Sequence, residues 1–205
     1  MTDPSRTDFN RRALQLEYAT IGWNVGEAVL TISLGIAAGS LALIGFGSDS
    51  IIEIFASLVV VWHLIPGHEY DHPERTALAL RLVAVAFAVL AVALVSLSIR
   101  DLLTQRQPDE SPWGVAYLAV TALVMFALAR SKHRLADRLD SAPLRSEASM
   151  TFLDGMLSAG TMLGLALNAL LGWWWADPLA ALMVGLVAAN EARENWEEAG
   201  ELLDD

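Results

Sequence analysis

One apolar stretch of the chain, residues 41–65, reads LALIGFGSDSIIEIFASLVVVWHLI. It is long enough to cross a bilayer as a helix, because about 20 mostly apolar residues span roughly 30 Å of hydrocarbon. Two carboxylates, Asp49 and Glu53, lie inside it four residues apart, and therefore on one face of a helix. A carboxylate at this depth is costly and is usually retained for a function. The stretch predicts a membrane span with a polar site inside it.

Five further stretches are similarly apolar and poor in charge. They are expected to form helices at residues 18–38, 76–99, 113–129, 147–171 and 177–190. The pair Asp177-Pro178 predicts the start of the last helix, as an N-cap followed by proline at the first helical position. The fold class that follows is all-α, a six-helix transmembrane bundle.

The composition agrees with a membrane domain. Of 205 residues, 55% are apolar and 18% charged, whereas soluble domains average about 45–50% and about 25%. The absence of cysteine excludes disulfides, thiolate metal ligands and cysteine catalysis. A net charge of −11 argues against nucleic-acid binding, which requires a basic surface. We expect a cytoplasmic N-terminal tail over residues 1–17, which can also be an interfacial lead-in to the first helix. The membrane domain is expected over 18–198 and an acidic tail over 199–205.

Basic residues are distributed unevenly between the two ends of the predicted helices. If both termini are cytoplasmic, Arg100 and Arg106 alone fall on the outer side, and the other eleven of the 13 Lys and Arg fall inside. Positive charge favours the cytoplasmic side of a membrane. Both termini are therefore expected in the cytoplasm, in a multi-pass integral protein of the inner (plasma) membrane. The dense basic run from Arg130 to Arg145 predicts a cytoplasmic loop.

A third carboxylate, Asp154, lies in the predicted helix 147–171. That helix runs antiparallel to the helix that carries Asp49, and both carboxylates are expected roughly 11–14 Å deep. No Arg or Lys falls in the middle of a predicted span to neutralise them. Three carboxylates from two helices can form an oxygen site for a divalent cation. We therefore predict a metal site of Asp49, Glu53 and Asp154.

Other polar residues extend this predicted site. Glu27 lies nearly three turns into the first span and needs water, a proton or a partner, so it is a further candidate ligand. Asn24, Ser50 and Ser158 are expected to line the cavity, although Asn24 can equally hydrogen-bond a neighbouring helix. The loop after residue 65 suggests an accessory metal site, with a solvated loop as the alternative. Its candidate ligands are His68, Asp71 and His72.

The order of these motifs resembles that of the cation diffusion facilitators. Residues 37–53, AAGSLALIGFGSDSIIE, resemble the signature of that family's first two helices, and residues 147–158 and 168–178 resemble its helices five and six. The resemblance implies six transmembrane helices, a homodimer, and efflux of a divalent metal from the cytoplasm in antiport with protons. It also implies that the acidic pair on helix two binds the metal together with Asp154 and with the residue four positions before it, Met150.

Two features depart from the family pattern. The first is Met150, which stands where the family has His or Asp, and a thioether is a weak, soft ligand. Either Met150 binds a softer ion, or Glu27, Ser149, Thr151 or water completes an oxygen-rich site. The second arrangement favours Mn²⁺ or Fe²⁺ and leaves zinc open. The second departure is at the end of the chain. Only a short acidic tail follows the last span, so we do not expect the cytoplasmic domain that the family usually carries after helix six.

The sequence thus predicts a proton-coupled divalent metal transporter that works by alternating access and needs no cofactor. Its expected cargo is Zn²⁺, Mn²⁺, Fe²⁺, Co²⁺ or Cd²⁺, and its expected partners are protons, the lipid bilayer and a second copy of the chain. The alternative is a non-transporting membrane protein that binds a metal or a partner and modulates another transporter. An enzyme is not expected, because no nucleophile–base pair or metalloprotease motif is present.

Overall fold

A computed structural model describes residues 4–38, 41–65, 73–105 and 112–204. These residues form six helices and no strand, which confirms the predicted all-α six-helix bundle. The helices are α1 (Pro4–Ala38), α2 (Leu41–Leu64), α3 (Pro73–Thr104), α4 (Pro112–Leu139), α5 (Ala142–Leu171) and α6 (Ala176–Asp204).

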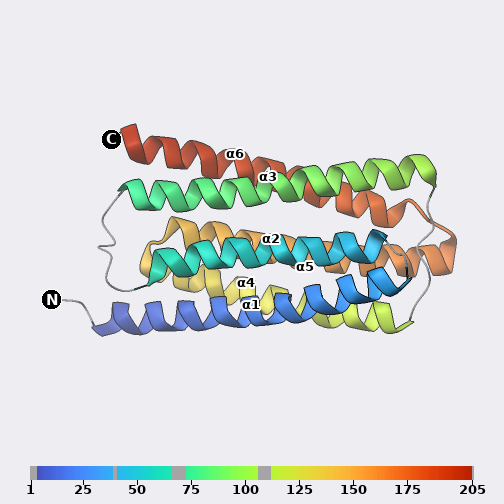
Figure 1. The fold of residues 1–205 in the computed structure, drawn as a ribbon, viewed down its shortest axis with the longest axis horizontal. Helices are drawn as coiled ribbons and strands as arrows, with labels where there is room; N and C mark the ends of the chain where they lie inside the picture. The colour runs from blue at the N-terminus through green and yellow to red at the C-terminus, as the bar shows by residue number, and fades with distance from the viewer. Residues whose placement is uncertain (1–3, 39–40, 66–72, 106–111, 205) are drawn as a thin grey trace.

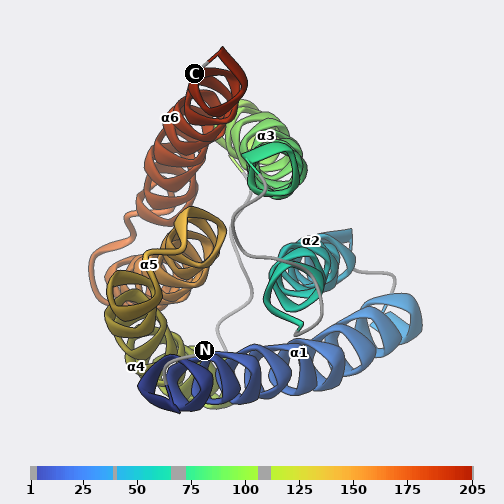
Figure 2. The same cartoon turned by 90° about the vertical axis from the view of Figure 1, so that its left-hand side faces the viewer.

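Successive helices run antiparallel along the long axis of the bundle, so α1 begins and α6 ends at the same end (Figure 1). We call this the inner end, because the charge distribution predicts that it is cytoplasmic. Figure 2 shows the helices in neighbouring pairs, α3 with α6, α4 with α5 and α1 with α2. α2 and α5, which carry the three predicted carboxylate ligands, contact each other.

The bundle buries polar side chains and exposes apolar ones. Glu17, Lys132 and Glu147 are completely buried, whereas Val92 and Leu123 are 68% and 71% exposed. Exposed apolar side chains are unfavourable in water but not in the hydrocarbon of a bilayer. Among the described residues, α3, α4 over Val115–Leu139 and α5 are long and apolar enough to cross a membrane. The distribution supports an integral membrane protein.

Several helices extend beyond the apolar stretches that predicted them. α1 begins at Pro4 and α5 at Ala142, and α4 continues to Leu139. The expected loop over Arg130–Arg145 is therefore wrong, because all but a short turn of it is helical. Ser141 caps α5: its Oγ accepts a hydrogen bond from the Leu144 N–H at 3.5 Å. A polar cap and a basic helix end replace the predicted loop.

α5 and α6 approach each other closely at Gly164. A Cβ added to Gly164 would lie 2.6 Å from the Cα and 2.7 Å from the backbone N of Asp177. α6 begins at Ala176, so Asp177 lies in its first turn and not at the predicted N-cap. Glycine is required here because backbone atoms, which cannot rotate away, occupy the space.

Gly164→Ala is expected to lower the free energy of unfolding by roughly 1–3 kcal/mol, because the added methyl group forces the two helices apart. Thermal unfolding of the purified protein in detergent measures this. Gly22→Ala is the matched control, since no atom of the described residues lies within 4 Å of the Cβ it would add. Alanine is also the better helix former, by up to about 1 kcal/mol. Equal melting temperatures for Gly164→Ala and the wild type would contradict this packing.

Candidate metal site

Three helices bring buried carboxylates together inside the bundle. α1 contributes Glu27, α2 contributes Asp49 and Glu53, and α5 contributes Asp154. Glu27, Glu53 and Asp154 are buried, and Asp49 is half-buried. Asp154 lies close enough to the other three to be repelled by each of them. The structure therefore places the three predicted ligands and Glu27 in one electrostatically coupled group.

These carboxylates do not form a closed coordination shell. Within the described ranges, no three His, Asp or Glu side chains converge closely enough to hold a metal ion. Like charges that share a site repel one another unless a proton or cation lies between them. Glu53 Oε1 and Asp154 Oδ2 are buried and have no hydrogen-bond partner among the residues described. Such acceptors usually find a partner, so they are available to a cation or a proton. Metal binding by Asp49, Glu53 and Asp154 stays a prediction.

Glu27 is held by hydrogen bonds from two other helices. Ser50 Oγ of α2 donates to Glu27 Oε2 at 3.1 Å, and the Tyr117 hydroxyl of α4 donates to Glu27 Oε1 at 2.5 Å. Both carboxylate oxygens are therefore engaged, and α1, α2 and α4 are connected through one side chain. Ser50 was predicted as a cavity residue from the sequence, whereas Tyr117 was not.

Tyr117→Phe is expected to lower the free energy of unfolding by about 1–3 kcal/mol, because it leaves an oxygen of a buried carboxylate without its donor. Thermal unfolding in detergent is the measurement. The matched control is Tyr18→Phe, which alters the same hydroxyl at a position on α1 that is 57% exposed. A Tyr117→Phe protein as stable as Tyr18→Phe would contradict the importance of this hydrogen bond.

The remaining predicted cavity residues, Asn24 and Ser158, are also buried. Asn24 lies beside Glu53. Within the described part of the chain, neither the Asn24 amide nor the Ser158 hydroxyl makes a hydrogen bond. Both therefore present free polar atoms inside the bundle, close to the carboxylates in the case of Asn24.

Met150 lies in the apolar core. It is 1% exposed and belongs to a cluster with side chains of α2, α3 and α6, including Val59, Phe87 and Val184. This is the position of a packing residue, and a role as ligand stays a prediction. The predicted accessory site, His68, Asp71 and His72, lies outside the described residues.

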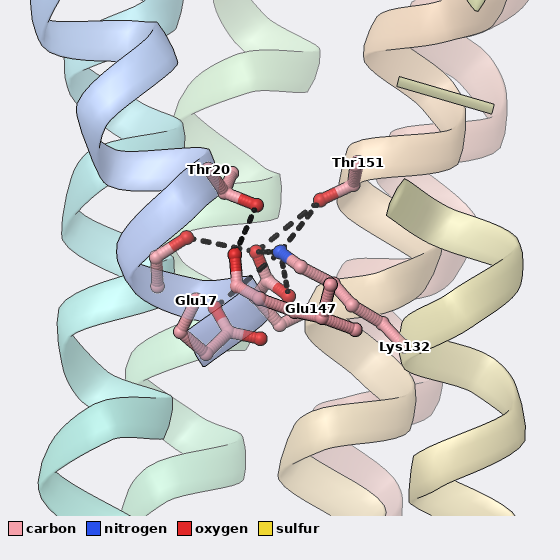
Figure 3. A network of polar contacts seen from close by, with 7 residues as sticks. Glu17, Thr20, Lys132, Glu147 and Thr151 are labelled. Atoms are coloured by element: carbon pink, nitrogen blue, oxygen red, sulfur yellow. Dashed lines mark hydrogen bonds and ion pairs between the residues drawn. The ribbon is translucent and has the colours of Figure 1, made fainter. Parts of the chain in front are cut away.

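A second charged network, which was not predicted from the sequence, lies nearer the inner end. The Lys132 ammonium Nζ of α4 lies 2.7 Å from both carboxylate oxygens of Glu147 and 3.3 Å from Glu17 Oε2 (Figure 3). Nζ also donates to Thr151 Oγ1 at 3.2 Å. Ser57 Oγ donates to Glu147 Oε1 at 2.9 Å. All five side chains are completely buried, and they connect α1, α2, α4 and α5.

This network corrects one expectation. Lys132 was predicted to lie in a cytoplasmic loop; instead α4 continues past it, and its side chain is buried. Glu17 ends the segment predicted as a tail or an interfacial lead-in to the first helix, and the structure places it inside α1. One signal could have pointed to Glu147, because Glu147, Thr151 and Asp154 are spaced to lie on one face of a helix.

Comparison with known proteins agrees with this architecture. Residues 18–203 match the family described as the cation efflux transmembrane domain. An uncharacterized transporter of Synechocystis is 27% identical over 173 residues, which are 79% of this chain and 56% of that protein. The cation-efflux pump FieF of Shewanella oneidensis is 23% identical over 180 residues, 82% of this chain and 60% of the pump.

The chain thus spans between half and two thirds of the length of these curated relatives. Both relatives are named as a transporter or a pump. The match over residues 18–203 covers most of the chain and includes Glu27, Asp49, Glu53 and Asp154. The chain therefore belongs to the family of cation efflux transmembrane domains.

Proposed function

We propose that this protein exports a divalent metal cation from the cytoplasm in exchange for protons. The observation that carries the proposal is the group of four carboxylates, Glu27, Asp49, Glu53 and Asp154, inside a membrane bundle, where Asp154 is repelled by each of the other three. Membrane proteins retain such charges for ion or proton pathways. The family to which the chain belongs, and the name of its Shewanella oneidensis relative, support cation efflux as the direction.

The exchange follows from the charge of the site. Several carboxylates in one low-dielectric site must share protons or a cation. A divalent cation that enters from the cytoplasm replaces the protons. When the bundle opens to a more acidic exterior, protons return and release the cation. Alternating access is the motion this requires, since the two ions must occupy the same carboxylates in turn.

The donor atoms available favour a hard cation. The polar side chains close to Asp49, Glu53 and Asp154 include Asn24 and Glu27, and these provide oxygen atoms. Met150, the candidate sulfur ligand, packs in the apolar core. Carboxylate and carbonyl oxygens suit Mn²⁺ better than the softer Cd²⁺. We therefore propose Mn²⁺ or Fe²⁺ ahead of Zn²⁺, Co²⁺ and Cd²⁺. We also propose a homodimer in the plasma membrane, on the family resemblance.

Metal flux into proteoliposomes with an imposed pH gradient tests this proposal. Mn²⁺ uptake is expected when the lumen is acidic and is expected to fall severalfold when a protonophore removes the gradient. A panel of Mn²⁺, Fe²⁺, Co²⁺, Zn²⁺ and Cd²⁺ ranks the ions. Uptake that ignores the gradient would contradict proton exchange, and no uptake of any of the five ions would contradict transport.

A further inference from the structure

The buried polar residues near the carboxylates continue toward the inner end of the bundle. On α5, Thr151 and Glu147 follow Asp154 at successive turns, and on α2 Ser57 lies one turn inward of Glu53. Residues three or four apart lie on one face of a helix. On α1 the same spacing relates Glu27 to residues nearer the inner end, all of them buried: Asn24, Thr20 and Glu17.

At the inner end of this stripe, oxygen atoms surround a single positive charge. The Lys132 ammonium has both Glu147 oxygens at 2.7 Å, Thr151 Oγ1 at 3.2 Å and Glu17 Oε2 at 3.3 Å (Figure 3). These four oxygens come from α1 and α5. Carboxylate and hydroxyl oxygens are also the ligands that hard metal cations take. The Lys132 ammonium therefore occupies a position whose surrounding oxygen atoms suit a cation.

Carboxyl groups outnumber ammonium groups at this position. Two carboxylates, Glu17 and Glu147, face one ammonium, and both are completely buried. Glu17 Oε1 is buried and has no hydrogen-bond partner among the residues described. Lys132 also interacts electrostatically with Glu53 of the carboxylate group. The position is thus adjacent to the predicted metal site and has spare acceptor capacity.

We propose that Glu17, Glu147 and Thr151 form a second binding station for a divalent cation, which the Lys132 ammonium fills when no metal is there. The station lies on the inner side of Asp154 and Glu53. A lysine side chain is flexible, so an arriving divalent cation can displace the ammonium and take its oxygens. That the ion is the transported one rests on the proposed function; the binding itself does not.

The test is the number of Mn²⁺ ions bound per chain in detergent, counted by electron paramagnetic resonance. We expect one tightly bound ion in the wild type, where the Lys132 ammonium competes for the second station and keeps its occupancy brief. We expect two in Lys132→Met, and one again in Lys132→Met/Glu147→Gln. In Lys132→Met/Asp154→Asn we expect a single ion, at the second station. The matched control is Arg145→Met, because Arg145 pairs with Asp137 across the same two helices at 3.5 Å in an exposed position. This control should bind one ion, like the wild type.

A Lys132→Met protein that binds no more Mn²⁺ than the wild type would overturn the second station, as would an additional ion that persists in Lys132→Met/Glu147→Gln. These counts do not depend on transport. If the wild type moves no metal in proteoliposomes while Lys132→Met binds its second ion, the proposed function fails and the station stands.

Lys132→Met leaves two buried carboxylates without their counter-charge and can fail to fold, so a milder variant provides a second test. Glu17→Gln keeps the shape of the side chain and removes one charge at the 3.3 Å contact. It is expected to raise the KM for Mn²⁺ transport at least fivefold, because the station holds the entering ion less tightly. A purely structural role for Glu17 leaves KM unchanged, and that result would overturn the proposal.

Discussion

Asp154→Asn is expected to abolish Mn²⁺ transport in proteoliposomes, with a loss of at least about 100-fold. Loss of an outer partner of a metal site already costs about 10–100-fold, and a first-sphere carboxylate should cost more. Asparagine has nearly the same size, so the substitution removes a charge from a buried group and leaves the packing in place. In wild-type protein that charge lies beside Glu53, Asp49 and Glu27.

The same variant should be at least as stable as the wild type. Removing one of several mutually repelling carboxylates relieves the repulsion, and active sites commonly trade stability for function in this way. Thermal unfolding measures stability alongside the flux assay. Asp137→Asn is the control, because it is the same chemical change at an exposed position. The Asp137 side chain lies on α4 and is 72% exposed. A folded Asp154→Asn protein with wild-type flux would refute the carboxylate site.

The sequence is sufficient to predict the bundle and its central carboxylates, for one physical reason. Lipid tolerates few charges, so Asp49 and Asp154 stand out against the apolar residues around them. Their spacing also gives the face of the helix on which they lie. The helix ends were harder to place, because α1 and α4 continue past the apolar stretch into polar sequence. Hydropathy indicates which part of a helix lies in the hydrocarbon of the bilayer, and it does not indicate where the helix begins or ends.

The inner network could not be predicted for the same reason. Lys132 lies among Arg130, Arg134 and Arg138, a composition typical of a cytoplasmic surface, and nothing in the sequence distinguishes the one basic residue that turns inward. Its partner Glu17 is 115 positions away. Tyr117 is similar, because its hydrogen bond to Glu27 joins residues 90 positions apart. Pairings of this range depend on how the helices pack.

Glu147→Leu is expected to lower the free energy of unfolding by about 3–5 kcal/mol, because it leaves the buried Lys132 ammonium without its closest partner. For a chain of this size that corresponds to a fall of roughly 6–20 °C in melting temperature. The control is Arg145→Leu, which breaks the exposed pair with Asp137. Exposed pairs contribute about 0–1 kcal/mol, so little change is expected there. A Glu147→Leu protein that melts like Arg145→Leu would contradict the burial of this network.

The triple variant Glu17→Leu/Lys132→Met/Glu147→Leu separates stability from function. It removes all three charges together and fills their space with apolar groups, and buried ion networks replaced in this way often lose no stability. We therefore expect its melting temperature to return to within a few degrees of the wild type, while Mn²⁺ flux stays at least about tenfold reduced, as for the loss of a residue that supports a metal site. A triple variant that is stable and transports normally would show that the network only holds the helices together. One that is as unstable as Glu147→Leu would show that the charges are required for the fold itself, because apolar packing cannot replace them.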